Sequence, residues 1–172
     1  MRIANRLQKL RQKLADKELD AILVSQPENR YYLSGFDGSS GFLLITPQNA
    51  VLATDFRYVE QAKAQAPDYQ IFQITGNMSG WLPRLIAELN LSRLGFETGH
   101  VTFGLYQQLS GILNKAKSRL KLVPVNGLVE SLRAIKEPEE IELIAMAAEI
   151  TDRAFEYIEG RIHTGMAEKE VA

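Results

Sequence analysis

The chain has 172 residues, of which 45% are hydrophobic and 24% charged, a balance ordinary for a globular protein with one well-buried domain. Its 20 basic and 21 acidic residues give a net charge of −1, so we expect neither nucleic acid nor a membrane surface as a partner. The absence of cysteine excludes disulfides and thiolate zinc sites. No apolar run has membrane-spanning length and no signal-peptide pattern opens the chain, so we expect a cytoplasmic protein.

Apolar spacing predicts a helix, a strand and a second helix in the first 35 residues. Ile3–Leu14 places apolar residues at intervals of three and four among basic and amide residues, which is typical of a helix packed on a sheet. Asp20–Val24 is a short apolar run that predicts a strand buried on both faces. Pro27 suits the first turn of a short helix that ends near Gly35.

Two apolar runs, Phe42–Ile45 and Val51–Ala53, flank a four-residue turn and predict a β-hairpin. After the hairpin, helical and strand patterns alternate: helices over 56–66, over 79–90 with Ser79 as N-cap and over 102–117, and strands over 69–74, 93–97 and 121–125. This alternation indicates an α/β fold, a three-layer α/β/α domain with a mixed sheet whose one reversal comes from the hairpin.

The pattern changes from Asn126 onward. Leu128–Ile135 predicts a short amphipathic connector, and Pro138 followed by two glutamates predicts the start of a long helix with an apolar face reaching Ile162. Periodicity alone fits a helix docked on its own domain, a short coiled coil or part of a second domain. Residues 164–172 have the pattern of the first two turns of a further helix, so we interpret the chain as a fragment that ends inside a second domain.

The hairpin brings the loop 35–41 and the segment 54–58 to the same end of the sheet, opposite the turn. Arg57 lies there, and residue types favour either an ion pair with Asp37 or Asp55, or donation to a carboxylate or carbonyl of a ligand. Thr54 or Asp55 also suits the cap of the helix that follows. The loop glycines suit a tight turn or a close approach to a ligand or subunit, but the lysine of a phosphate loop is missing.

The two histidines do not form a metal-binding pattern. His100 follows a glycine in a loop and is expected to be a surface or capping residue, whereas His163 comes near the end of the long helix, where a cation suits the helix dipole. The sequence therefore assigns no metal ligand and no catalytic residue to this chain.

Four motifs in order resemble the amino-terminal part of the Xaa-Pro peptidases, the aminopeptidase P and prolidase group. They cover most of the chain: YYLSGFDGSSG from Tyr31, TDFRYVEQA from Thr54, RLGFE from Arg93, and LRAIKEPEEIELIAMAAEITDRAF from Leu132. The resemblance implies a ribonuclease H-like domain of the creatinase/prolidase N-terminal type over residues 1–126, a linker over 127–136, and the start of a truncated pita-bread catalytic domain over 137–172.

In that group, the pita-bread domain binds two divalent metal ions, Mn²⁺ or Co²⁺, through two Asp, one His and two Glu, and a bridging hydroxide attacks the bond before proline. This chain contains none of that ligand set. The resemblance implies that the full-length protein is an Xaa-Pro aminopeptidase acting on short proline-containing peptides. It also implies a homodimer, in which this domain mediates assembly and active-site access.

The resemblance adds a role for Arg57, because the arginine of the matching Asp-x-Arg-Tyr motif in related aminopeptidases reaches the substrate. We therefore predict Arg57, with Asp37 as its neighbour, as substrate-binding residues. Three alternatives stay open: an Xaa-Pro dipeptidase, a non-catalytic peptide-binding relative that lost its metal ligands, and a relative of creatinase. The residues after Ala172 distinguish them.

Overall fold

A computed structural model describes residues 2–87, 89, 91–116 and 119–171. The chain divides into two compact units, residues 1–133 and 134–172. The sequence places the end of the first domain at residue 126, whereas the first unit runs on to Arg133. It does so because Leu128 and Val129 are buried in the core of the sheet. The predicted helix ends at Asn90, Lys117 and Ala172 lie outside the described residues.

The first unit is built on a six-stranded sheet with the order β4-β3-β2-β1-β5-β6. Only β2 runs antiparallel to its neighbours, so the single reversal predicted from the hairpin is confirmed. The strands are β1 Ala21–Val24, β2 Phe42–Ile45, β3 Ala50–Asp55, β4 Gln70–Ile74, β5 Arg93–Glu97 and β6 Lys121–Val125.

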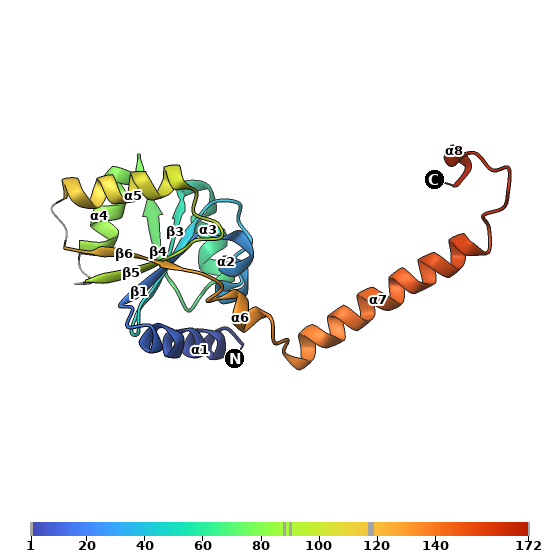
Figure 1. Ribbon diagram of the computed structural model, residues 1–172, viewed down its shortest axis with the longest axis horizontal. Helices are drawn as coiled ribbons and strands as arrows, with labels where there is room; N and C mark the ends of the chain where they lie inside the picture. Colours follow the sequence, from blue (N-terminus) through green and yellow to red (C-terminus); the bar gives the residue numbers. More distant parts are fainter. Residues whose placement is uncertain (1, 88, 90, 117–118, 172) are drawn as a thin grey trace. The chain divides into compact units, whose positions relative to one another are not determined.

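Helices cover both faces of the sheet, which confirms the predicted three-layer α/β/α architecture (Figure 1). One hydrophobic cluster joins a sheet face to α1 Arg2–Asp16, α2 Pro27–Ser34 and α3 Val59–Gln65. The other joins the opposite face to α4 Met78–Ala87 and α5 Phe103–Lys115. β1 shows why both layers are needed: Ile22 and Val24 face the first cluster, and Ala21 and Leu23 the second, all at 1% exposure or less.

The hairpin turn is stabilised by one threonine. Thr46 Oγ1 accepts hydrogen bonds from the backbone N–H groups of Gln48 and Asn49, and the Thr46 N–H donates to the Asn49 carbonyl. The register pairs Phe42 with Ala53 and Ile45 with Ala50. β3 therefore extends beyond the predicted run to Asp55, because parallel pairing with β4 continues through that residue.

Two helix starts differ from the prediction. The helix expected from residue 56 begins as a 3-10 turn, η1 Phe56–Tyr58, before α3 starts at Val59. Ser79 is not the cap of α4, because Asn77 Oδ1 accepts from the backbone N–H of Gly80 and from Ser79 Oγ. An amide two residues earlier thus replaces the expected hydroxyl.

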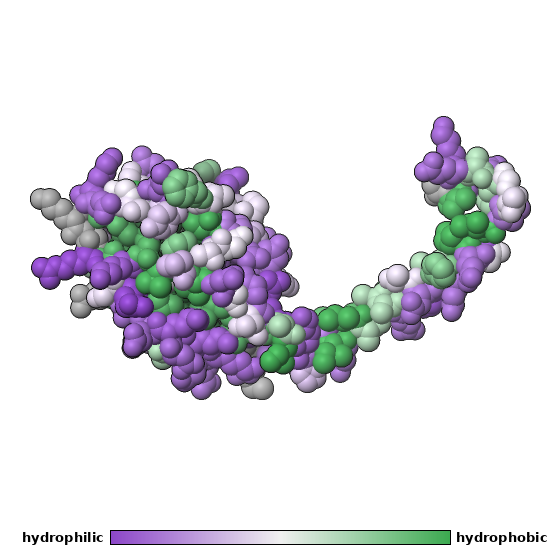
Figure 2. Space-filling view, viewed as in Figure 1, coloured by the Kyte–Doolittle hydropathy of each residue, from purple (hydrophilic) through white to green (hydrophobic). Residues whose placement is uncertain are grey.

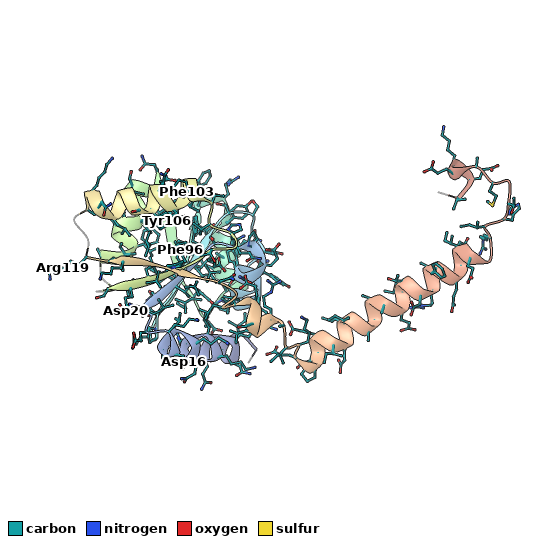
Figure 3. The ribbon with its side chains drawn as sticks, viewed as in Figure 1. Asp16, Asp20, Phe96, Phe103, Tyr106 and Arg119 are labelled. Atoms are coloured by element: carbon teal, nitrogen blue, oxygen red, sulfur yellow. The ribbon has the colours of Figure 1, made fainter. Side chains whose placement is uncertain are left out.

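An acidic side chain binds the start of β5, and an aromatic pair lies near its other end. Asp20, labelled in Figure 3, precedes β1 and accepts hydrogen bonds from the backbone N–H groups of Ser92 and Arg93. Near the other end, Phe96 lies against Tyr106 of α5 with ring centroids 5.4 Å apart, while the neighbouring Phe103 is exposed. The edge at which β1, β3 and β5 end is called the carboxyl edge below.

The second unit contains α7 Pro138–Glu159 and α8 Glu168–Val171. Glu137 and Glu140 form a capping box at the start of α7, so the predicted helix start is confirmed. The helix ends at Glu159, before the predicted end at Ile162. Figure 2 shows apolar groups among hydrophilic ones along this helix, and none of its side chains is buried. In the part of the chain that the structure describes, no helix is long and apolar enough to cross a membrane.

Candidate functional site

The carboxyl edge gathers the polar residues that the sequence singles out. β2 enters the sheet at this edge because it runs antiparallel to β3, so the loop 35–41 before β2 lies beside η1 after β3. Ser40 connects the two segments directly, since its carbonyl accepts a 2.7 Å hydrogen bond from Thr54 Oγ1. The prediction that both segments meet at one end of the hairpin is confirmed.

Arg57 forms its ion pair with Asp55, one of the two partners that the sequence allows. Nε donates to Oδ1 at 2.9 Å and Nη2 to Oδ2 at 2.8 Å, while the Arg57 backbone N–H donates to Oδ1 at 3.1 Å. The guanidinium also lies over the Tyr58 ring, 5.1 Å from its centroid. Asp55 thus engages one edge of an arginine that is 59% exposed, and no described contact engages Nη1.

This ion pair shifts the acid–base behaviour of both members. Hydrogen bonding from Arg57 lowers the pKa of Asp55 to about 2, and the same interaction raises the pKa of Arg57. Both side chains therefore carry their charges throughout the neutral range.

Asp37 has a different partner from the one predicted. Gln61 Nε2 donates to Asp37 Oδ1 at 2.6 Å, and the Asp37 backbone N–H donates to Gln65 Oε1. Both glutamines belong to α3, which continues from the turn that carries Arg57. The structure therefore places Asp37 against α3, which directly follows the turn that carries Arg57. The acid that pairs with Arg57, however, is Asp55. Arg57 pairs with Asp55 rather than Asp37 because Asp55 is only two residues away, so that its carboxylate reaches the guanidinium within one turn.

Ser39 and Tyr58 complete the exposed surface of this edge. Their hydroxyl groups lie 2.7 Å apart, and the Tyr58 ring packs edge-on against Phe36 with centroids 6.1 Å apart. The residue type alone assigns no role to Tyr58, because most tyrosines in proteins are core or interface residues. Its placement between Ser39 and Arg57 depends on contacts across the hairpin.

A second polar cluster lies at the ends of β1 and β5 and was missed from the sequence. Glu97 is 6% exposed and accepts hydrogen bonds from the backbone N–H groups of Ser25 and Gln26 and from Asn29 Nδ2, at 2.6, 2.8 and 2.7 Å. It thereby satisfies donors at the start of α2. The available signal was an acid closing the apolar strand RLGFE, since a carboxylate there needs buried donors.

The same cluster reaches the end of the first unit. Asn29 Nδ2 donates to Glu130 Oε1 at 2.7 Å and Asn29 Oδ1 accepts from Arg133 Nη1 at 2.8 Å, so α6 Glu130–Arg133 is tied to α2. His100 is exposed, with Nδ1 2.9 Å from Ser25 Oγ. This agrees with the expected surface position of that histidine.

Neither cluster fits a metal ion. In the described ranges, no group of three or more His, Cys, Asp and Glu side chains has an arrangement that could hold one. The carboxyl edge instead offers a fixed guanidinium, hydroxyl groups and a glycine-rich loop, which suit hydrogen bonding to a carbonyl or carboxylate rather than metal-assisted chemistry.

The creatinase/prolidase N-terminal domain profile matches residues 6–135, nearly the whole first unit. The chain belongs to this family. It is 36% identical over 167 residues to a Bacillus subtilis protein named uncharacterized peptidase YqhT, covering 97% of this chain and 46% of that protein. The resemblance read from the four motifs is thus confirmed.

Solved structures agree with this family assignment. An Xaa-Pro dipeptidase from Bacillus anthracis is similar with a TM-score of 0.87 and 36% identity, over 98% of this chain and 46% of that one. The N-terminal domain of the cytoplasmic peptidase PepQ from Mycobacterium tuberculosis is similar with a TM-score of 0.68 and 40% identity, over 74% of this chain and 98% of that one. The chain spans about half the length of the curated relatives it matches.

The lowered pKa of Asp55 can be measured by titration. Because the pKa of Asp55 in the folded state lies below the ordinary aspartate value of about 3.9, the pair contributes stability above pH ~4 and loses it as the pH falls through ~2. In carboxyl-detected NMR titrations, Asp55 should have a pKa of about 2. Arg57→Ala should raise this pKa, and the control Lys63→Ala should not. An Asp55 pKa unchanged by Arg57→Ala would contradict the assignment.

Removal of the Glu97 carboxylate should destabilise the first unit. Glu97→Ala leaves the backbone N–H groups of Ser25 and Gln26 without their acceptor, and each unsatisfied buried donor costs about 1–3 kcal/mol, so we expect a loss of roughly 2–6 kcal/mol. The control Glu60→Ala removes an exposed glutamate paired with Lys63 and should cost less than about 1 kcal/mol. Urea denaturation measures both. Equal losses would show that Glu97 is not a structural anchor.

Proposed function

We propose that this chain is the amino-terminal part of an Xaa-Pro aminopeptidase, which hydrolyses the peptide bond between an N-terminal residue and proline. The observation that carries the proposal is the creatinase/prolidase N-terminal profile over residues 6–135, together with the likeness of most of the chain to solved Xaa-Pro peptidases, among them an X-Pro aminopeptidase. In this proposal, the domain limits access to the active site and supports homodimer assembly, while the chemistry takes place outside this chain.

The metal requirement of the proposed enzyme is assigned outside these residues. In this proposal, the two divalent ions, Mn²⁺ or Co²⁺, are bound outside this chain, and the absence of a possible metal-binding group among the described residues supports that assignment. Short proline-containing peptides are the proposed substrates. A cytoplasmic location is supported by the similarity to the cytoplasmic peptidase PepQ and by the cysteine-free composition.

Arg57 and Asp37 are the substrate-binding residues of this proposal. Asp55 and the Tyr58 ring hold the guanidinium in one orientation, and its Nη1 edge points away from the carboxylate that engages Nε and Nη2. A planar donor with a permanent charge suits a peptide carbonyl or carboxylate. Asp37, held by Gln61 on the next turn, adds an exposed acceptor for a peptide amine or N–H.

An Xaa-Pro dipeptidase is the second candidate. The likeness to the Bacillus anthracis dipeptidase, with 36% identity over 98% of this chain, favours it. The two activities differ in substrate length, so the choice depends on what surrounds the cleft of the complete protein. The carboxyl edge fits both activities, because Arg57 can donate hydrogen bonds either to a carbonyl or to a terminal carboxylate.

The function is tested with the full-length protein loaded with Mn²⁺ or Co²⁺. Xaa-Pro-Yaa tripeptides should be cleaved before proline, whereas the 172-residue chain alone should show no activity because its described residues do not assemble a metal site. Cleavage of Xaa-Pro dipeptides alone would replace the aminopeptidase by the dipeptidase. Absence of both activities in the metal-loaded protein would contradict the proposal.

Substitution of Arg57 separates substrate binding from stability. Arg57→Ala in the full-length enzyme should lower kcat/KM for tripeptides at least tenfold, about 1.4 kcal/mol of transition-state binding. Its melting temperature should barely move, because an exposed ion pair contributes less than about 1 kcal/mol. The control Arg119→Ala changes an exposed arginine before β6, at the opposite edge of the sheet (Figure 3). Wild-type kcat/KM in Arg57→Ala would remove Arg57 from the site.

A further inference from the structure

Arg30 is a buried cation that the sequence analysis did not single out. Its side chain belongs to α2 and is 3% exposed. Nη1 donates to the Gly41 carbonyl at 2.8 Å and Nη2 to the Gly38 carbonyl, while Nε has no described partner. Burial lowers the pKa of Arg30 from its usual value, whereas the nearby charge of Glu28 acts in the opposite direction.

Among the described residues, the buried Arg30 guanidinium has no hydrogen-bonded carboxylate, although the charge of Glu28 favours its charged form. Removing an ion from water costs several kcal/mol, and two backbone carbonyls and the Phe36 ring, 5.6 Å from the guanidinium carbon, only partly offset that cost. An apolar side chain of similar length would fill the same space without charge desolvation. Arg30 is therefore explained by what its two bonds hold rather than by stability.

Those bonds hold the loop that precedes β2. The two accepting carbonyls belong to Gly38 and Gly41, and Ser39 and Ser40 lie between them. Gly38 leaves no room for a side chain, because a Cβ there would lie 2.2 Å from the Phe36 ring. The two Arg30 donors thus hold the glycine loop against Phe36. In this position Ser39 is exposed and Ser40 is half-buried.

Both serines contact residues close to the exposed Arg57. Ser40 accepts from Thr54 at the end of β3, and Ser39 Oγ lies 2.7 Å from Tyr58 Oη. Tyr58 packs edge-on against Phe36 and carries Arg57 over its ring. A continuous set of described contacts therefore runs from a buried arginine to an exposed one.

We infer that Arg30 is a positioning residue for Arg57, acting through the loop 38–41 and Tyr58, and that it sets the orientation in which Arg57 meets substrate. This inference rests on the proposed function for the substrate, but the contact path is a property of the chain itself. Asp55 restrains one edge of the Arg57 guanidinium, and the Tyr58 ring packs against the guanidinium face. Arg30 controls the second restraint.

The chain alone tests the contact path by NMR of the Arg57 Nε–H group. Arg30→Met should shift or broaden this resonance. The control Arg11→Met should leave it unchanged, although Arg11 also donates to a backbone carbonyl, that of Thr46 at the hairpin turn. If Arg30→Met destabilises the fold too far, Ser39→Ala cuts the path at the surface and should change the same resonance. An unchanged Arg57 signal in a folded Arg30→Met or Ser39→Ala chain overturns the inference.

Kinetics of the full-length enzyme tests the consequence. Arg30→Met should lower kcat/KM for tripeptides at least ~fivefold in the wild-type background and less than ~twofold in an Arg57→Ala background, because coupled residues are not additive. Equal losses in both backgrounds would mean that Arg30 acts through stability alone and would overturn the inference. If the NMR path is present but Arg57→Ala keeps wild-type activity, the positioning stands and the proposed role of Arg57 fails.

Discussion

A single antiparallel strand inside an otherwise parallel sheet is the constraint on which the site of this protein depends. β2 pairs with β1 on one side and β3 on the other, and it enters the sheet at the edge where both neighbours end. The loop before it must therefore return to the carboxyl edge, next to the turn that carries Arg57. A parallel strand in the same place would enter from the opposite edge and would leave Arg57 without Ser39, Ser40 or Asp37 nearby.

Two buried ionisable side chains at this edge bind backbone groups rather than each other. Arg30 donates to carbonyls of the loop before β2, and Glu97 accepts from N–H groups at the start of α2. Each buried charge costs free energy, but each also orients a loop that has no regular hydrogen bonding of its own. The exposed Asp55–Arg57 pair differs, because solvent screens it and its geometry matters more than its contribution to stability.

Most of the fold follows from local patterns. Every described strand overlaps a predicted apolar or alternating segment, because these patterns reflect burial. The reversal at the hairpin follows from two apolar runs separated by a short turn. The differences arise where two nearby residues could each cap a helix, as with Asn77 in place of Ser79, and where the connector after β6 packs into the core. Leu128 and Val129 belong to the first unit because the sheet face beneath them needs cover, which no local signal at these residues reveals.

The candidate site also combines features that the sequence predicts with features that depend on the tertiary structure. The sequence by itself determined that Arg57, Asp55, Asp37 and the glycine loop meet at one edge, since a hairpin joins segments that are close along the chain. Only the tertiary structure decided that Arg57 pairs with Asp55 rather than Asp37, and that Arg30 and Glu97 are buried. Glu97 meets its donors 71 and 72 residues away along the chain. Partners at that separation are chosen by strand order and layer packing, and these contacts have no counterpart in any local pattern of residues.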